Sequence, residues 1–537
     1  MPSRLLNIVH PTMVRLQNCA SAPPAPYAAL SSCWGNRRFE RLLSADIQLW
    51  EAGRGIDTMP HTIVDAITVA RNLGLSYLWV DALCIVQDSH EDIMKLIAEI
   101  PAVFENAYLT IGASRGDGMD TGFLFPRSYA CHHASSDWAL SDEDWSRAVD
   151  VFGTFEVDIR GCVDTDHAST FLQQSGVPQT TITTILNLVD VEKRQYLNVD
   201  QFAVAVYLVN CQRGQKNVGL LPQVLPDKLA LPRKAGTQQR SPLDQRAWCL
   251  QERLLSGRYL AFGPDEVTWT CNTAERCECT GWMSRKPHKW SHDEWRKSIV
   301  PEFTQRKVTY ESDTLLAIAA IAKKVAEATG DTYLCCLWRN DILRGLLWYP
   351  VSSKEPWTPC SSYTAPTWSW AAGSGPVRFH DFDKVADRDR MRVVPKVVVE
   401  SVRARPIAEN PFGQVQDGHI MLVGTTVRGD ISRDGSSFTP QAYLGFRESA
   451  FKITSPRPFD ITRESSSPQD TIFLPIIALE TAYPEATDTK PISYGLLLAP
   501  NTTNKWVTSF SEYRRVGTCV IEGLTDEYGT AATVVIV

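Results

Sequence analysis

One short stretch of the sequence places polar side chains where they could do chemistry. Residues 77–87 are apolar apart from three polar positions, Asp81, Cys84 and Gln87. A buried carboxylate costs free energy unless something pairs with it. Asp81 therefore either caps a neighbouring loop or lies at the carboxyl end of a parallel strand, where open α/β sheets bind their ligands. Both interpretations remain open from this stretch alone, and Asp81 and Cys84 are the first candidate functional residues.

Other kinds of chemistry lack their usual signatures. Ser32, Cys33 or Cys84 could serve a hydrolase together with a histidine, but no family-specific cysteine signature supports this. The turn at 33–35 has a single glycine, whereas Rossmann and Walker phosphate loops need several. The three cysteines within 271–279 have a C-x5-C-x-C spacing, which is not a usual zinc-binding pattern. We therefore expect no metal site.

The composition is that of an ordinary globular protein. The chain has 537 residues, of which 44% are hydrophobic and 21% charged, and this length predicts about two to four domains. The net charge of -7 leaves no basic surface for nucleic acid. No apolar run is long enough for a membrane span or a signal peptide, so a cytoplasmic protein is expected. The 14 cysteines lie mostly in apolar stretches and are expected to be free thiols.

The elements around Asp81 alternate between strand and helix. Residues 27–35 read as a strand that ends at a glycine turn, and the apolar spacing of 60–74 predicts a helix. Residues 77–87 form the next predicted strand. A second helix begins at Ser89 with a capping box, although Pro101 should kink or end it. With a third strand at 107–113, the pattern predicts a parallel sheet in which the first two strands end side by side.

Four segments of this region resemble the fungal HET (heterokaryon incompatibility) domain, both in their order along the chain and in their amino-acid sequences. They are 27–35, 77–88, 106–127 and 246–256, and the segments 312–320, 333–348 and 365–371 resemble those that usually follow that domain. The resemblance implies a fungal protein of non-self recognition and regulated cell death. It also implies action as a signalling module, through protein partners or self-association.

HET domains resemble TIR domains, whose flavodoxin-like parallel sheet either recruits partners or cleaves NAD at its glycosidic bond. Residues 248–252 read Trp-Cys-Leu-Gln-Glu, which is similar to the helix that carries the catalytic glutamate of enzymatic TIR proteins. The resemblance implies Glu252 as a candidate catalytic residue and NAD as a candidate substrate. The alternative is that Glu252 is a solvated helix residue paired with Arg246 or Arg253. The expected ligand-binding residues are Ser32, Cys33, Trp34, Gly35 and Trp248.

Between Arg127 and Ser241 the chain is longer than the HET pattern needs. The segments 171–178, 185–190, 196–208 and 219–226 of this insertion resemble the EH domain, a pair of EF-hands that binds Asn-Pro-Phe peptides. Its second loop has Arg194 and Gln201 at positions where calcium needs oxygen ligands and a bidentate glutamate, so calcium is not expected. Leu186 stands where EH domains carry the tryptophan that reads the peptide. The segment Asn410-Pro411-Phe412 is itself such a peptide sequence and suggests an intramolecular contact with the insertion.

The sequence thus predicts an α/β protein in four parts. The TIR/flavodoxin-like HET domain would comprise residues 1–137 and, with a helical extension, 235–380. Residues 138–234 would form the all-α EH-like EF-hand pair. The β-rich runs of 381–537 would form a C-terminal domain. Two functions stay open: a signalling and assembly module, or an enzyme using a cleft at the sheet end, either as an NAD glycohydrolase or redeployed in small-molecule metabolism.

Overall fold

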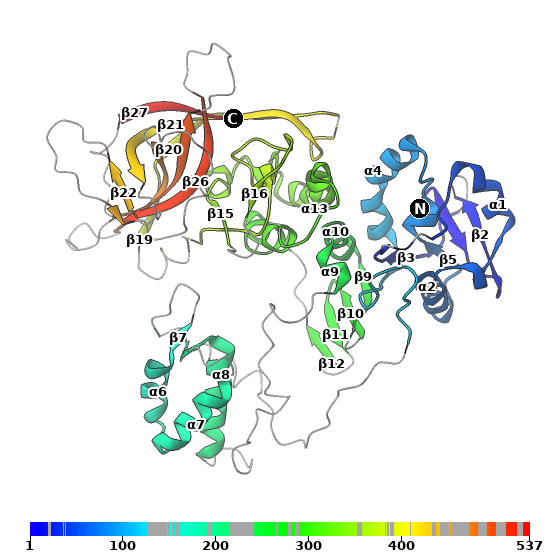
Figure 1. Ribbon diagram of the computed structural model, residues 1–537, viewed down its shortest axis with the longest axis horizontal. Helices are drawn as coiled ribbons and strands as arrows, with labels where there is room; N and C mark the ends of the chain where they lie inside the picture. The colour runs from blue at the N-terminus through cyan, green and yellow to red at the C-terminus, as the bar shows by residue number, and fades with distance from the viewer. Residues whose placement is uncertain are drawn as a thin grey trace. The chain divides into compact units, whose positions relative to one another are not determined.

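The structure of the chain, a computed structural model, divides into two compact units (Figure 1). The first joins Met1–Phe125 to Ser241–Val537, and the second is Pro126–Arg240. The four-part division expected from the sequence stays a prediction. The structure describes residues 1–19, 23–35, 37, 39–125, 148, 151–152, 155, 162–190, 195–213, 241–264, 267–277, 281–284, 289–351, 357–381, 383, 386, 391–408, 410–431, 437–440, 451–452, 472–481, 491–500, 512–522 and 530–537.

A mixed sheet organises the N-terminal part of the first unit. Its described strands follow the order β12-β11-β10-β9-β6-β3-β5-β1-β2-β4. The four central strands β9, β6, β3 and β5 run parallel, and antiparallel strands extend the sheet at both edges. The strands are β1 (Arg4–Asn7), β2 (Met13–Asn18), β3 (Ala28–Ser31), β4 (Arg54–Gly55), β5 (Tyr77–Trp79), β6 (Leu109–Gly112), β9 (Arg258–Phe262), β10 (Val267–Cys271), β11 (Ala274–Cys277) and β12 (Gly281–Ser284).

The ends of the first two predicted strands meet as expected, but the second strand is shorter. β3 pairs in parallel with β5 on one side and with β6 on the other. The prediction of a single strand over 77–87 is wrong, because β5 ends at Trp79 and Asp81–Cys84 form the helical turn α3. The physical reason is local: Asp81 Oδ1 accepts a hydrogen bond from the Ala82 N–H at 2.7 Å, which satisfies a donor at the start of the turn.

Two helices connect these strands, and Figure 1 shows them on opposite sides of β3 and β5. α2 (His61–Asn72) buries the apolar face that its spacing predicts. α4 (His90–Asn106) starts at Ser89, whose hydroxyl accepts a hydrogen bond from the Asp92 N–H at 3.2 Å. Pro101 does not end this helix, which continues for another five residues. The short elements beside them are α1 (Ile47–Ala52) and the 3-10 turns η1 (Ser44–Asp46) and η2 (Ile56–Thr58).

A helical region with a tryptophan-rich core follows the sheet strands. Its elements are α9 (Pro242–Gln245), α10 (Trp248–Leu255), α11 (His292–Glu294), η3 (Trp295–Ile299), α12 (Val300–Phe303), η4 (Glu311–Asp313), α13 (Thr314–Thr329), α14 (Ile342–Gly345), η5 (Trp370–Ala372), β13 (Tyr333–Leu334), β14 (Leu337–Trp338), β15 (Trp348–Pro350), β16 (Thr358–Pro359), β17 (Gly373–Ser374) and β18 (Val377–Phe379). Five tryptophans here are at most 1% exposed: Trp295, Trp338, Trp348, Trp368 and Trp370. They make core rather than a ligand surface.

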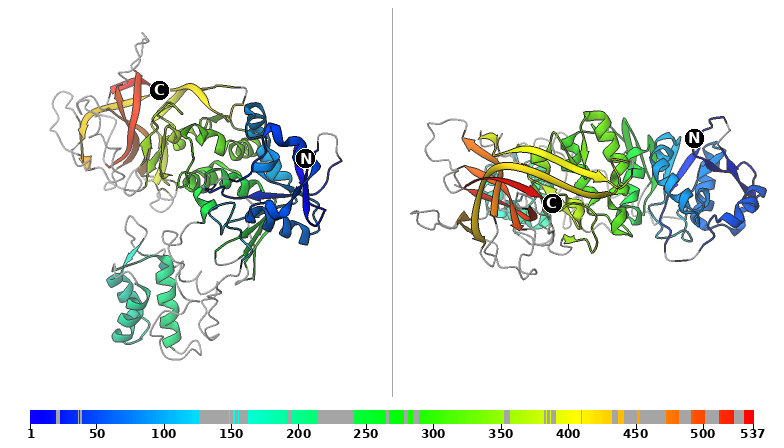
Figure 2. Two further views of the ribbon diagram at one scale, coloured as in Figure 1. Left: turned by 45° about the vertical axis from the view of Figure 1, so that its right-hand side comes forward. Right: turned by 90° about the horizontal axis from the view of Figure 1, so that it is seen from above.

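The C-terminal residues form a closed ring of strands, which curls on itself in Figure 2. The ring runs β21-β24-β25-β26-β27 and back to β21, and the β21–β24 pairing closes it. All its pairs are antiparallel except β26 with β27. The bounds are β19 (Met391–Pro395), β20 (Val397–Pro406), β21 (Val415–Ile431), β22 (Ser437–Pro440), β23 (Phe451–Lys452), β24 (Ile472–Thr481), β25 (Ile492–Pro500), β26 (Glu512–Glu522) and β27 (Thr530–Ile536). The expected β-rich C-terminal region is confirmed.

The second unit is helical in its described part. It contains α6 (Thr165–Gln173), α7 (Gln179–Val189) and α8 (Val199–Gln212) around a core of its own. The short strands β7 (Val163–Asp164) and β8 (Tyr196–Leu197) pair antiparallel and tie the start of α6 to the start of α8. Across the described residues of both units, no helix combines the length and apolar character needed to cross a bilayer.

Candidate functional site

The carboxyl end of β3 receives a glutamate from a helix far along the chain. Ser31 is the last residue of β3, and its hydroxyl donates a hydrogen bond to Glu252 Oε2 of α10 at 2.5 Å. The position of α10 is fixed by burial, because Cys249, Leu250, Gln251 and Leu255 are all buried. Glu252 is therefore held against the sheet rather than freely solvated.

Arg246 couples the candidate carboxylates electrostatically. This residue follows α9, and its Nη1 donates a hydrogen bond to the Ser32 carbonyl oxygen at 2.5 Å. Burial alone would lower the pKa of Arg246, but the acidic groups around it, Glu252 and Asp81 among them, outweigh burial and raise it. The guanidinium therefore remains charged beside both carboxyl groups.

Asp81 is held at the same end of the sheet by the turn that follows β3. Trp34 Nε1 donates a hydrogen bond to Asp81 Oδ2 at 2.7 Å. The side-chain amide of Gln87 donates to the Asp81 carbonyl oxygen at 3.1 Å, which fixes the backbone of the following turn. Because Ser31 and Trp34 belong to β3 and its turn, one short segment contacts both carboxylates. Asp81, Glu252 and the β3 turn thus converge, and we call Ser31, Trp34, Asp81, Arg246 and Glu252 the sheet-end cluster.

Burial sets the acidity of both carboxyl groups in the sheet-end cluster. Burial raises the pKa of Glu252, although Arg246 and the hydrogen bond from Ser31 act in the opposite direction. Burial also raises the pKa of Asp81, against the effects of Arg246 and Trp34. Two carboxyl groups with raised pKa values around one cation form a pattern that is enriched at functional sites.

Three other predicted ligand residues lie in the same turn but contribute differently. The Ser32 hydroxyl faces Met119 Sδ at 3.7 Å, so only its carbonyl oxygen contacts the sheet-end cluster. Cys33 packs with Leu243 and Cys249, and burial raises the pKa of its thiol. Gly35 has φ of +72°, and a Cβ at this position would lie 2.7 Å from the Gly118 Cα. The turn therefore requires glycine for shape and not for contact with a ligand.

Two predicted site residues lie away from the sheet-end cluster. Cys84 is 2% exposed at the end of α3, and its carbonyl oxygen accepts a hydrogen bond from Arg4 Nε at 2.9 Å. Burial raises the pKa of this thiol to about 12, which makes it a poor nucleophile. Trp248 packs against the tryptophan-rich core, and its indole faces Asp313 instead of Glu252.

Sequence reasoning named Arg246 only as a partner of a solvated Glu252, and it missed two further residues around Glu252. These are Ser31, which is part of the sheet-end cluster, and Tyr259 of β9, which is 6% exposed and interacts with the Ser31 hydroxyl. Each stands within, or just beyond, a segment that carries the HET resemblance. The HET-like segments therefore pointed to the right parts of the chain, but only the fold shows which of their side chains contact one another.

One serine motif also escaped the sequence reading. Residues 112–116 are Gly-Ala-Ser-Arg-Gly, which matches the Gly-x-Ser-x-Gly motif of a hydrolase nucleophile elbow. A nucleophile elbow turns from a strand directly into a helix. Here the motif follows β6 and leads into a loop up to Phe125, and Ser114 is 9% exposed. The arrangement does not support a serine hydrolase with Ser114 as its nucleophile.

The sheet-end cluster combines an ionisable carboxylate with a hydroxyl donor and a fixed cation. An ionised Glu252 can accept hydrogen bonds from the hydroxyls of a ribose and can stabilise positive charge on the sugar carbon. Within the part of the chain that the structure describes, no three His, Cys, Asp or Glu side chains gather as a metal site.

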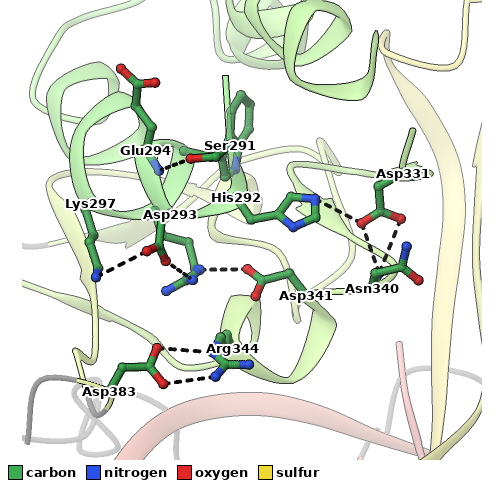
Figure 3. Close-up of polar contacts among 12 residues, drawn as sticks. Ser291, His292, Asp293, Glu294, Lys297, Asp331, Asn340, Asp341, Arg344 and Asp383 are labelled. Carbon is green, nitrogen blue, oxygen red and sulfur yellow. Dashed lines mark hydrogen bonds and ion pairs between the residues drawn. The ribbon is translucent and has the colours of Figure 1, made fainter. Parts of the chain in front are cut away.

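A second polar cluster lies in the helical region and satisfies itself (Figure 3). Asp331 accepts hydrogen bonds from the Asn340 N–H at 3.0 Å, and its Oδ2 lies 3.1 Å from His292 Nε2. Arg296, whose side chain is 4% exposed, donates to Asp341 Oδ2 at 2.6 Å. Because these groups are matched to one another, the cluster ties 289–300 to 331–344 and does not present a ligand site.

The second loop of the EH-like segment uses its described polar groups internally. Asp190 Oδ2 accepts a hydrogen bond from the Gln195 N–H at 2.8 Å. Gln195 has φ of +61°, at the position where an EF-hand has glycine. Gln201 forms a capping box with Asn198. Residues 191–194 of this loop, and residues 156–161 of the first loop of the EF-hand pair, lie outside the described residues. The expectation about calcium therefore stays a prediction.

The Asn-Pro-Phe segment lies in the loop between β20 and β21. Asn410 Oδ1 accepts a hydrogen bond from the Phe412 N–H at 3.0 Å, which closes a tight turn. The Phe412 ring packs against Tyr333 within its own unit, with 5.3 Å between ring centroids. The intramolecular contact with the EH-like segment stays a prediction.

Residues 27–252 match the family model described as "Heterokaryon incompatibility protein (HET)". This match confirms the resemblance seen in the sequence for that stretch. It includes the whole sheet-end cluster, and Glu252 is its last residue.

Two curated proteins match a smaller part of the chain, and the description of the first names an EH domain. The "EH domain-containing and endocytosis protein 1" of Saccharomyces cerevisiae is 29% identical over 118 residues, which are 22% of this chain and 8% of that protein. The "Epidermal growth factor receptor substrate 15 homolog" of Dictyostelium discoideum is 30% identical over 95 residues, 18% of this chain and 8% of that protein. The chain thus spans less than a tenth of these relatives. The matches are compatible with an EH-like insertion.

Proposed function

We propose, from the HET match of residues 27–252, that this chain is a cytoplasmic protein of heterokaryon-incompatibility type, acting in fungal non-self recognition and regulated cell death. Its output is the hydrolysis of NAD at the sheet-end cluster. Protein partners or self-association regulate that output. This combines the family role with a chemical activity for the residues that the fold gathers.

One observation carries the chemical part of the proposal. The glutamate of the Trp-Cys-Leu-Gln-Glu segment contacts Ser31 at the carboxyl end of a parallel strand, with Arg246 and Asp81 beside it. This is where open α/β sheets bind ligands. Glu252 and Ser31 are 221 positions apart in the sequence, and a glutamate that only solvates the helix surface would not need this contact with the end of β3.

The reaction follows from the charges present. The bond between the ribose C1′ and the nicotinamide nitrogen breaks, and nicotinamide leaves with the electron pair. The ionised Glu252 stabilises the positive charge on C1′ and orients the ribose hydroxyls. Water then adds to C1′ and loses a proton, which gives ADP-ribose. Arg246 favours the ionised form of Glu252, because its positive charge opposes in part the effect of burial, which raises the pKa of that carboxyl.

A second candidate function is signalling by assembly alone. The HET match favours it, since the resemblance covers modules that recruit partners without catalysis. The sheet-end cluster would then be structural, as a buried and mutually paired set of charges.

Nicotinamide release from NAD by the purified full-length chain separates the two functions. We expect release by the wild type and a loss of about 100-fold or more in Glu252→Ala, because the variant lacks the carboxylate that stabilises the transition state. Glu51→Ala in α1, an exposed position, serves as the matched control and should match the wild type. Chromatographic quantification of nicotinamide and ADP-ribose provides the measurement.

The contrary result is equally clear. If no nicotinamide is released at high protein concentration, even after the chain is oligomerised by an engineered dimerisation tag, the enzymatic proposal fails. Assembly alone would then be the remaining function.

A further inference from the structure

A group of charged side chains, here called the charged bracket, holds the α9–α10 segment. Its centre is Arg306, whose side chain is 3% exposed. Arg306 Nη1 donates hydrogen bonds to the carbonyl oxygens of Leu243 at 3.0 Å and of Arg246 at 3.3 Å. Its Nη2 lies 2.7 Å from Glu302 Oε1 and 3.3 Å from Asp244 Oδ1. The backbone on both sides of α9 is therefore fixed by one guanidinium.

Glu302 links this bracket to the helix that carries Glu252. The same Oε1 that pairs with Arg306 accepts a hydrogen bond from Arg253 Nη2 at 2.5 Å. Burial would raise the pKa of Glu302, but Arg253 and Arg306 outweigh burial and lower it. Glu302 is therefore ionised at neutral pH and joins two cations, one of which follows Glu252 directly in α10.

Backbone hydrogen bonds reinforce the bracket next to Arg246. The Lys307 N–H donates to the Gln245 carbonyl oxygen at 2.6 Å, and the Ala247 N–H donates to the Lys307 carbonyl oxygen at 3.0 Å. These two bonds flank Arg246 in the sequence. On the other side, the Arg246 side chain donates to the Ser32 carbonyl oxygen at 2.5 Å. Arg246 is thus clamped between the β3 turn and residues 302–307.

From these contacts we propose that Glu302 and Arg306 are positioning residues for the sheet-end cluster. They act through Arg246 and Glu252, so the functional unit extends beyond residue 252, where the family match ends, into α12 and the segment after it. This inference rests on the proposed NAD hydrolysis for its kinetic consequence. Its structural consequence is independent of catalysis.

The physical reason is the cost of an unpaired buried charge. Removing the Glu302 carboxylate leaves Arg306, at 3% exposure, with less compensation. The guanidinium then moves toward water and releases the Leu243 and Arg246 carbonyl oxygens. Arg246 loses its fixed position, and its opposing effect on the pKa of Glu252 weakens.

The test compares the full-length Glu302→Gln and Arg306→Lys variants with the wild type. Glu327→Gln is the matched control, because Glu327 is 53% exposed and pairs with Lys324 on the surface of α13. We expect amide hydrogen exchange in peptides covering 242–256 to accelerate about tenfold in both variants and to stay unchanged in the control. The kcat for NAD should fall about tenfold while KM stays within about twofold. The pH midpoint of kcat should move upward.

The outcomes are distinguishable. If the wild type is active, an unchanged pH midpoint in Glu302→Gln overturns the inference even when amide exchange accelerates, because a merely structural role would not move that midpoint. If the wild type releases no nicotinamide, the proposed function fails, and amide hydrogen exchange in the variants becomes the test of the positioning role. Faster exchange confined to residues 242–256 supports that role, and unchanged exchange overturns it. Glu302→Gln keeps the test valid if Arg306→Lys does not fold, since Glu302 is 42% exposed.

Discussion

At the scale of single residues, the carboxyl groups of Asp81 and Glu252 share one guanidinium in a partly buried place. Burial raises the pKa of each, so the charged forms that chemistry needs are held at a cost to stability. Arg246 reduces that cost without removing it. This balance makes the pH dependence of the chain a direct report on the sheet-end cluster.

Replacement of Glu252 by its neutral isostere should stabilise the fold at neutral pH. A carboxyl group whose pKa is raised on folding binds its proton more tightly in the folded state, so stability falls as pH rises from the ordinary value of 4.5 through the raised value. Glu252→Gln lacks this loss. We expect its melting temperature to exceed the wild type by about 2 °C above that window and to equal it at lower pH.

Calorimetric or fluorescence melting curves across pH provide the check for Glu252→Gln. The rate of nicotinamide release should rise with pH over the same window in the wild type, because only the ionised carboxylate stabilises the sugar cation. A variant less stable than the wild type at neutral pH would contradict the assigned direction of the pKa shift.

The two neighbouring serines offer a second contrast at this scale. Ser31 donates to Glu252, whereas the Ser32 hydroxyl faces Met119. Ser31→Ala should lower kcat about tenfold and raise the pH midpoint, because a hydrogen bond to the ionised Glu252 is lost. Ser32→Ala should leave both quantities unchanged. Steady-state kinetics across pH for the two variants test this, and equal effects would show that Ser31 does not act through Glu252.

At the scale of elements, the turn after β3 joins the two halves of the site. The turn carries Trp34, which holds Asp81, and it follows Ser31, which holds Glu252. Gly35 gives the turn its shape through a positive φ and a close approach to Gly118. The geometry of the site thus depends on a glycine that touches neither carboxylate.

Gly35→Ala should destabilise the fold more than an alanine placed at another positive-φ glycine. Gly330 at the end of α13 has φ of +67° but nothing within 4 Å of its virtual Cβ, so Gly330→Ala carries only backbone strain. We expect about 1 kcal/mol for Gly330→Ala and about 3 kcal/mol for Gly35→Ala. Urea unfolding of both variants measures the difference. Equal losses would show that the contact with Gly118 relaxes easily.

At the scale of the whole molecule, the chain interrupts one compact unit with another. Residues on both sides of Pro126–Arg240 build the same parallel sheet, because β9 pairs with β6 across the insertion. The C-terminal ring belongs to the same unit and is tied to the helical region by Phe412 and by the Gln414 side chain, which donates to the Ser312 carbonyl oxygen at 3.0 Å.

Replacing residues 126–240 with a flexible linker should leave the first unit folded. Among the described residues, the hydrophobic clusters of the first unit and the cluster of the second unit share no member, and a separate core is typical of an autonomous domain. We expect the melting temperature of the first unit to change by less than about 3 °C, with nicotinamide release retained. Thermal unfolding and the NAD assay test this. Loss of the folded sheet would mean that the insertion supplies essential contacts.

The sequence by itself determined the local features of this protein. Strand and helix periodicity predicted α2 and three of the four parallel strands, β3, β5 and β6. The capping box predicted the start of α4, and the residues of short segments identified the HET stretch, because each of these features is encoded by neighbouring residues. Only the tertiary structure decided that β5 stops before Asp81 and that Ser31 joins Glu252. It also decided that Arg246 acts on Glu252 while Arg253 pairs with Glu302, and that Cys84 and Trp248 lie elsewhere. Contacts such as the one between Ser31 and Glu252, 221 positions apart, depend on chain topology and on which face of α10 is buried, and no local pattern encodes them.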